Sequence, residues 1–66
     1  MQTVVAEINS PKITTREAAA DWFCATRFQR YRFRSVLDED GKFKLFEGLD
    51  WYRVSESGSG YLVWRL

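Results

Sequence analysis

Polar and apolar residues alternate along residues 27–37, which read RFQRYRFRSVL. Successive side chains of a β-strand point to opposite faces of its sheet. A strand here would therefore place a row of arginines on one face and a row of large apolar residues on the other. The basic row consists of Arg30, Arg32 and Arg34, and the apolar row of Tyr31, Phe33 and Leu37. We expect the apolar row to pack on a helix and the basic row to face solvent or a partner.

A helix is predicted just before this strand. Thr14 and Glu17 have the Thr-x-x-Glu spacing of a capping box, in which the threonine hydroxyl accepts a hydrogen bond from the glutamate amide. At about 100° per residue, one side of this helix is apolar and should face the core. That side contains Ala18, Ala19, Trp22, Phe23 and Thr26. Cys24 falls on the polar side, where we expect a small packing side chain or, as the alternative, a partly exposed thiol.

A tight hairpin is predicted at residues 38–42, which read DEDGK. The glycine of this segment can adopt the left-handed conformation that closes a short loop. If Asp38 faces Lys42 across the loop, then Arg34 faces Phe46 on the next strand. In that register the apolar residues of both strands lie on the same side, which favours it over a register shifted by one residue.

Alternation also predicts a strand at residues 3–8 and a final strand at 61–66. Turn-forming residues predict a turn at 47–50 and a flexible serine- and glycine-rich loop at 55–60. In the strand that follows the turn, Tyr52 and Val54 should point inward. Trp51 and Arg53 should then point outward, whereas a register shifted by one residue would bury Trp51 in the core, and the sequence leaves both registers open.

Together these segments predict one small α+β domain over residues 1–66. One N-terminal helix packs on one face of a small, mainly antiparallel sheet of four to five strands, in the order strand, helix and then four strands. Because one helix covers only one face, the opposite face should expose cations with aromatic residues among them. We expect a partner to bind there through Arg30, Arg32, Arg34, Lys44, Phe46, Trp51 and Arg53, with Lys42 and Tyr61 nearby.

The composition argues against catalysis. The chain has no histidine and one cysteine, so it lacks a Ser/His/Asp or Cys/His pair and the ligands of an ordinary zinc site. No glycine-rich phosphate-binding loop is present. We therefore expect no enzymatic activity, no cofactor and no metal. The apolar runs are far shorter than the roughly 20 residues of a membrane helix, which favours a cytoplasmic protein without a membrane partner.

The distribution of charge indicates a defined binding surface. Ten basic and nine acidic residues leave a formal net charge of +1, which argues against a protein that coats nucleic acid by bulk charge. Arginine beside tryptophan is typical of protein interfaces, so an acidic protein partner is the leading hypothesis. The alternative is a nucleic acid, with bases stacked on exposed rings and phosphates paired with cations. Homodimerisation through exposed aromatic residues is a third hypothesis.

Residues 12–19, KITTREAA, resemble the opening of excisionase-type winged-helix domains. In that family a short turn and a second helix follow, and the second helix enters the major groove of DNA. This chain departs from the pattern, because residues 24–27 contain no turn residue and the next segment alternates with a period of two. We therefore expect a strand there. If the resemblance held further, it would imply that Arg27, Arg30 and Arg34 share a helical face and contact duplex DNA.

Overall fold

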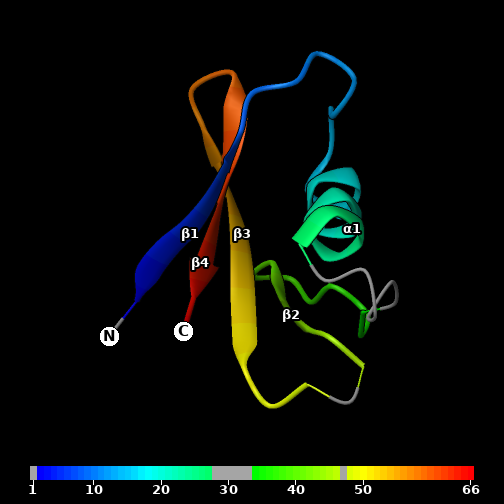
Figure 1. Cartoon of the computed structure of the whole chain (residues 1–66). Helices are drawn as coiled ribbons and strands as arrows, with labels where there is room; N and C mark the ends of the chain where they lie inside the picture. Colours follow the sequence, from blue (N-terminus) through cyan, green and yellow to red (C-terminus); the bar gives the residue numbers. More distant parts are fainter. Residues whose placement is uncertain (1, 28–33, 47) are drawn as a thin grey trace.

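One helix packs on one face of an antiparallel sheet in the computed structural model of the protein, which describes residues 2–27, 34–46 and 48–66 (Figure 1). The elements in chain order are β1 (Thr3–Ile8), α1 (Arg16–Arg27), β2 (Lys42–Lys44), β3 (Trp51–Ser57) and β4 (Gly60–Arg65). Within the described residues the sheet has four strands in the order β1-β4-β3-β2. The predicted α+β class, with its helix on one face of the sheet, is confirmed.

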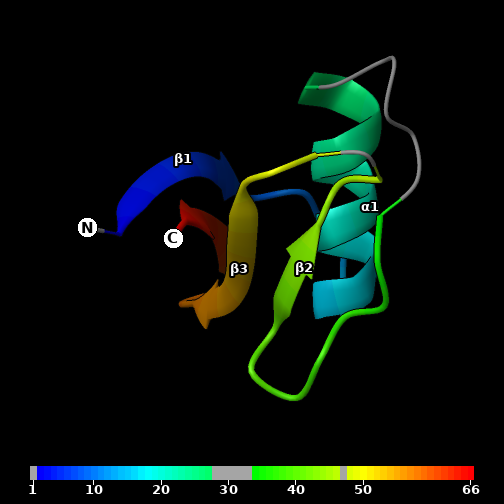
Figure 2. The ribbon, with the colours of Figure 1, turned by 90° about the horizontal axis from the view of Figure 1, so that it is seen from below.

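The first and last strands are neighbours in the sheet. Antiparallel pairing joins β1 to β4 from Thr3 opposite Arg65 to Ile8 opposite Tyr61, with a bulge between Val4 and Ala6. The two termini accordingly lie side by side (Figures 1 and 2). β4 is therefore an inner strand, and it separates β1 from β3.

The prediction of a flexible loop at residues 55–60 is wrong. β3 continues to Ser57 and β4 begins at Gly60, so the hairpin turns on two residues only. Gly58 has a φ of 58° there, as a tight turn with the right-handed twist of a hairpin requires. The short turn also fixes the β3–β4 register, which places Val54 opposite Val63.

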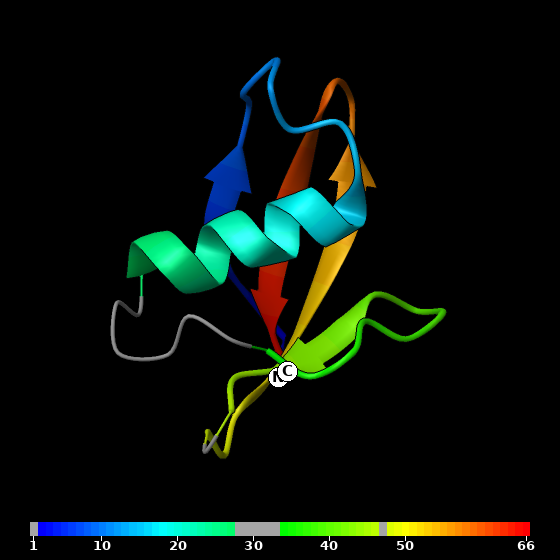
Figure 3. The same cartoon turned by 90° about the vertical axis from the view of Figure 1, so that its right-hand side faces the viewer.

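The core lies between α1 and the sheet face that it covers (Figure 3). Of the hydrophobic residues whose burial is described, four from the helix and six from the sheet and its flanks are buried. The buried set is Ala19, Ala20, Phe23 and Cys24 from α1, with Ile8, Phe43, Leu45, Tyr52, Val54 and Val63. Phe23 meets Tyr52 with ring centroids 5.2 Å apart and Phe43 with centroids 6.2 Å apart, so three aromatic rings fill the space beside the small helix residues.

The helix is turned relative to the predicted orientation. Trp22 was expected in the core but is 42% exposed, and Cys24 was expected on the polar side but is fully buried. Small side chains at Ala20 and Cys24 let the helix approach the sheet closely, whereas the indole of Trp22 would hold it away. The predicted cap is also displaced by one residue, because Thr15 Oγ1 accepts a 3.0 Å hydrogen bond from the Ala18 amide.

Part of the predicted strand at residues 27–37 can be compared with the structure. Residues 28–33 lie outside the described part of the chain. From Arg34 onward the segment makes an isolated antiparallel bridge to Leu45 rather than a regular strand. Among the described residues, no helix has the length and apolar character that a membrane span requires.

Candidate functional site

The sheet face opposite α1 has no described element packed on it (Figures 1 and 3). Residues on this face alternate along each strand with the buried residues of the core. We call it the outer face and define it as Val4 and Glu7 of β1, Lys42 and Lys44 of β2, Trp51, Arg53 and Ser55 of β3, Leu62 and Trp64 of β4, and Leu66 just after β4. It joins cations and large apolar side chains on one surface.

Strand register arranges these residues in rows across the sheet. One row runs through all four strands, because Val4 pairs with Trp64, Trp64 with Arg53, and Arg53 with Lys42. In the next row Lys44 pairs with Trp51, whose carbonyl accepts a 3.0 Å hydrogen bond from the Leu66 amide. The cations therefore lie on the β2–β3 side of the outer face and the aliphatic residues on the β1–β4 side.

Each tryptophan of the outer face has a cation near its ring. The Lys44 Nζ lies 5.7 Å from the ring centroid of Trp51, and the Arg53 guanidinium carbon lies 6.0 Å from that of Trp64. Such contacts contribute about 0.5–1 kcal/mol at exposed sites. They hold the positive charges near the rings and leave less ring surface for a stacked ligand.

Hydrogen bonds fix the half-buried part of the outer face. The indole Nε1 of Trp64 donates to Ser55 Oγ at 2.9 Å, and Arg53 Nη2 donates to Gln2 Oε1 at 3.0 Å. Within the described residues, the buried Arg53 Nε has no hydrogen-bond partner. The arginine is therefore positioned by its neighbours, whereas Lys42 extends into solvent.

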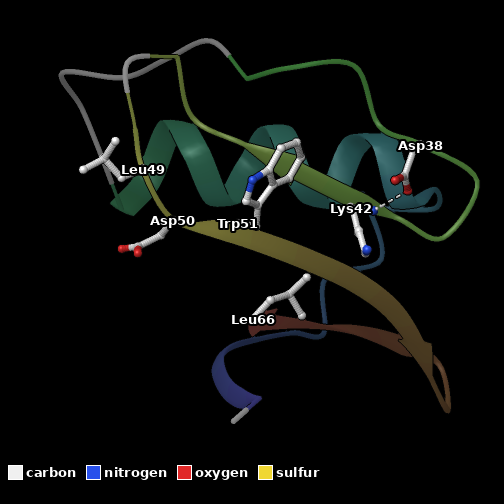
Figure 4. A pocket seen from close by; sticks show the side chains of 6 residues that line it. All are labelled: Asp38, Lys42, Leu49, Asp50, Trp51 and Leu66. Carbon is white, nitrogen blue, oxygen red and sulfur yellow. Dashed lines mark hydrogen bonds between the residues drawn. The ribbon is translucent and has the colours of Figure 1, made fainter.

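A hollow of about 510 Å³ lies at one end of the outer face (Figure 4). It is lined by Asp38, Lys42, Leu49, Asp50, Trp51 and Leu66, and the side chains of Lys42, Trp51 and Leu66 lie on the side of the sheet away from the helix. Leu49 is 94% exposed and Trp51 is 45% exposed. Exposed apolar groups at a hollow are typical of an interaction site. Its border also carries two carboxylates, Asp38 beside Lys42 and Asp50 on the other side of Trp51 (Figure 4).

The structure brings together only some of the predicted partner-binding residues. Lys44, Trp51 and Arg53 lie on the outer face, as expected. Phe46 is 58% exposed in the turn that follows β2, outside the two rows. Arg30 and Arg32 lie outside the described residues. Tyr61, expected nearby, instead packs partly buried against the core.

Arg34 lies on the opposite side of the sheet from the outer face. Its Nε donates to Asp21 Oδ1 of α1 at 2.8 Å, and its Nη2 pairs with Glu17 one turn earlier in the helix. Only 8% of its side chain is exposed. Burial acts to lower the pKa of the guanidinium, but the hydrogen bond to Glu17 and the charge of Asp21 outweigh burial and raise that pKa above its ordinary value.

A slip of one residue explains the position of Arg34. Asp38 and Lys42 face each other as predicted, with the Asp38 amide donating to the Lys42 carbonyl at 3.1 Å. Farther along, Arg34 is opposite the buried Leu45 instead of the exposed Phe46. A shift of one position moves a side chain to the other face. The predicted register is therefore wrong at Arg34, whose side chain turns toward the helix.

The sequence prediction omitted Leu62, Trp64 and Leu66 from the partner-binding set. Alternation already places these three residues on one face of the last strand. The information that was missing is the register between β3 and β4, which the two-residue turn at Gly58 sets. Once Val54 and Val63 are known to pair inward, Trp64 must point outward beside Arg53.

In the described part of the chain, no group of three or more Cys, Asp or Glu side chains could hold a metal ion. Cys24 is buried, and burial raises the pKa of its thiol from 9.0 to about 11, so the thiol is protonated at neutral pH. The chain matches no protein-family model, no curated protein and no solved structure. Function must therefore be inferred from the outer face itself.

Proposed function

We propose that this protein is a non-enzymatic interaction module that docks an acidic protein partner on its outer face. The observation that supports this function is the combination of exposed Lys42 and Trp51 with half-buried Lys44 on a sheet face that no described element covers. Tryptophan and arginine are frequent contributors to binding energy at protein interfaces, and the outer face has both in Trp51 and Arg53. Acidic side chains of the partner would complement the three cations of the β2–β3 side.

A protein partner is favoured over a nucleic acid by two features of the outer face. Lys44 and Arg53 already lie against the tryptophan rings, which leaves less ring surface for stacked bases. Asp38 and Asp50 border the hollow and would repel negative charge there, which disfavours a nucleic acid because it carries a phosphate at every nucleotide. A folded protein surface can instead combine apolar contact with a few carboxylates placed opposite the lysines. Nucleic acid is therefore the second candidate.

Site-specific photo-cross-linking tests the proposal. A benzophenone amino acid replaces Trp51 on the outer face or, as a matched control, Trp22 on α1. The two tryptophans are 45% and 42% exposed, so they differ mainly in location. We expect the probe at position 51 to capture a protein from cells that make this chain, through an acidic segment identified by mass spectrometry. We expect the probe at position 22 to leave that protein uncaptured.

Charge reversal provides the second arm of this experiment. Lys42→Glu should abolish cross-linking at position 51, whereas Lys12→Glu, which makes the same charge change at another exposed lysine, should not. Capture that is equal at positions 51 and 22, or that survives Lys42→Glu, would overturn the docking site. If the probe instead captures a second copy of this chain, the outer face mediates homodimerisation and does not bind an acidic partner. Sedimentation at several concentrations would confirm the dimer.

Oligonucleotide titration distinguishes the nucleic-acid alternative. Neutralising three phosphates would give a log–log salt slope of about −2 to −3 in fluorescence anisotropy, depending on strandedness. If the protein binds with such a slope, and if the Lys42→Glu and Lys44→Glu variants no longer bind, the ligand of the outer face is a nucleic acid and not a protein. We expect no binding of that kind at low salt.

A further inference from the structure

We infer that the partner presents an amphipathic α-helix, with acidic residues on one flank, to the outer face. This inference rests on the proposed function and adds the shape of the bound segment. The partner helix would place its apolar side on Leu62 and Trp64 of β4 and on Leu66 just after it, and its carboxylates opposite Lys42 and Lys44 of β2. The sheet would then lie between two helices, with α1 on the inner face.

The backbone of the bound segment gives the first reason for a helix. A peptide that lies across the face of a sheet finds no edge on which to form a ladder of hydrogen bonds. An extended peptide on the outer face would bury amide and carbonyl groups against Trp64 and Leu66 without partners, which is costly. A helix satisfies these groups internally and presents side chains only. An apolar sheet face therefore favours a helical ligand over an extended one.

The dimensions of the outer face give the second reason. Four strands about 4.8 Å apart span roughly 14 Å between their outermost axes, and a helix with its side chains is about 10–12 Å wide. Along β4, the outward residues from Leu62 to Leu66 cover about 13 Å at roughly 3.3 Å per residue. That length equals about two and a half helical turns. One helix therefore covers the apolar side of the outer face.

The positions of the lysines give the third reason. Lys42 and Lys44 project from one strand at a spacing of about 6.6 Å. Two residues at positions i and i+4 of a helix are separated by about 6.0 Å along its axis. β2 lies two strands, or about 9.5 Å, from β4, so its lysines lie beside a helix seated on β4 and not beneath it. An acidic pair at i and i+4 on the flank of the helix would meet both lysines.

Synthetic peptides provide the test. The first probe is a helical peptide of about 18 residues with leucines on one side, glutamine elsewhere and a glutamate pair at i and i+4 on the flank. In the second probe the same pair points away from the leucines. The third probe carries proline at two positions of the first and cannot form the helix. Binding is followed through the indole N–H resonances of the labelled protein, because Trp51 and Trp64 report on the outer face and Trp22 on α1.

We expect the first probe to shift the signals of Trp51 and Trp64 but not that of Trp22, with tenfold or more weaker binding to the Lys42→Glu/Lys44→Glu protein. The second probe should bind that protein and the wild type equally. The result that would overturn the helix is equal or tighter binding of the proline peptide at Trp51 and Trp64, although it would leave the proposed function intact. Failure of all three probes also overturns the helix, whereas position-51 cross-linking independently decides whether the outer face docks a protein.

Discussion

Arg34 donates a hydrogen bond of 2.8 Å from Nε to Oδ1 of Asp21, and this bond ties the segment before β2 to helix α1. The same guanidinium pairs with Glu17 and donates from Nη1 to the Ser35 carbonyl at 2.8 Å. The side chain of Arg34 is nearly buried, whereas the carboxylates of Glu17 and Asp21 remain mostly exposed. These two ion pairs therefore lie at the border of the core. An arginine expected to contact a partner therefore stabilises the fold.

Arg34→Ala should lower the free energy of unfolding by about 1.5–3 kcal/mol, the range for hydrogen bonds to charged groups. The matched control is Arg65→Ala, because Arg65 is 57% exposed and its Nη2 lies 3.5 Å from Asp50. We expect that control to cost less than about 1 kcal/mol, as for most exposed ion pairs. Urea unfolding followed by circular dichroism measures both values. Equal losses would show that Arg34 is not a structural residue.

Thr15 and Thr14 offer a second matched pair at the start of α1. Thr15→Ala removes the side chain that accepts from the Ala18 amide, so it should cost about 1 kcal/mol of stability. Thr14→Ala should change the stability little, because Thr14 precedes the cap. Thermal unfolding measures both variants. If Thr14→Ala lowers the melting temperature more than Thr15→Ala does, Thr14 caps the helix, as the Thr-x-x-Glu spacing predicted.

Gly41 should tolerate substitution much less well than Gly58. Both have positive φ, of 82° and 58°, so alanine is strained at either position. A Cβ at position 41 would also lie 2.4 Å from the Val54 carbonyl oxygen, whereas one at position 58 would meet nothing within 4 Å. We expect about 1 kcal/mol of destabilisation for Gly58→Ala, from strain alone, and clearly more for Gly41→Ala. Chemical denaturation of the two variants tests this order.

The thiol of Cys24 should make stability fall at alkaline pH. Its pKa is raised from 9.0 to about 11 by burial, so between these values the unfolded chain has lost a proton that the folded chain retains. The unfolded state then binds fewer protons, and the free energy of unfolding decreases as the pH rises through this window. Below pH 9 the contribution is constant.

Cys24→Ala supplies the control for this pH dependence. Comparison of denaturation at pH 8, 9 and 10 should show a smaller decrease in the alanine variant, once its lower stability at pH 8 is subtracted. The native thiol should also resist a disulfide exchange reagent at pH 8 until the protein unfolds, because it is buried. Rapid reaction of the native protein, or identical pH profiles for the two proteins, would contradict this account.

Local sequence patterns predicted much of the fold. Alternation pointed Tyr52 and Val54 inward and Trp51 and Arg53 outward in one of the two registers left open, and the structure has that register. The left-handed Gly41 was recognised from its turn. These features depend on neighbouring residues only. The strand expected over residues 28–33 remains a prediction, since that segment lies outside the described residues.

The errors arose where longer-range packing decides the outcome. The orientation of α1 depends on how closely Cys24 and Ala20 approach the sheet, and the helix alone has two similar apolar stripes. The face of the sheet on which Arg34 lies depends on a register shift of one residue, which pairs Arg34 with Leu45 and not with Phe46. The candidate site changed for the same reason, because Trp64 joins the outer face only through its pairing with β3.

The position of β4 between β1 and β3 also has a consequence for how the chain folds during synthesis. A growing chain that has emerged only through β3 has no strand to join β1 to the rest of the sheet. Contacts between residues distant in sequence form slowly, because closing a long loop costs entropy. We therefore expect the sheet to assemble after β4 has left the ribosome, in a single late step, and to remain open to chaperones until then.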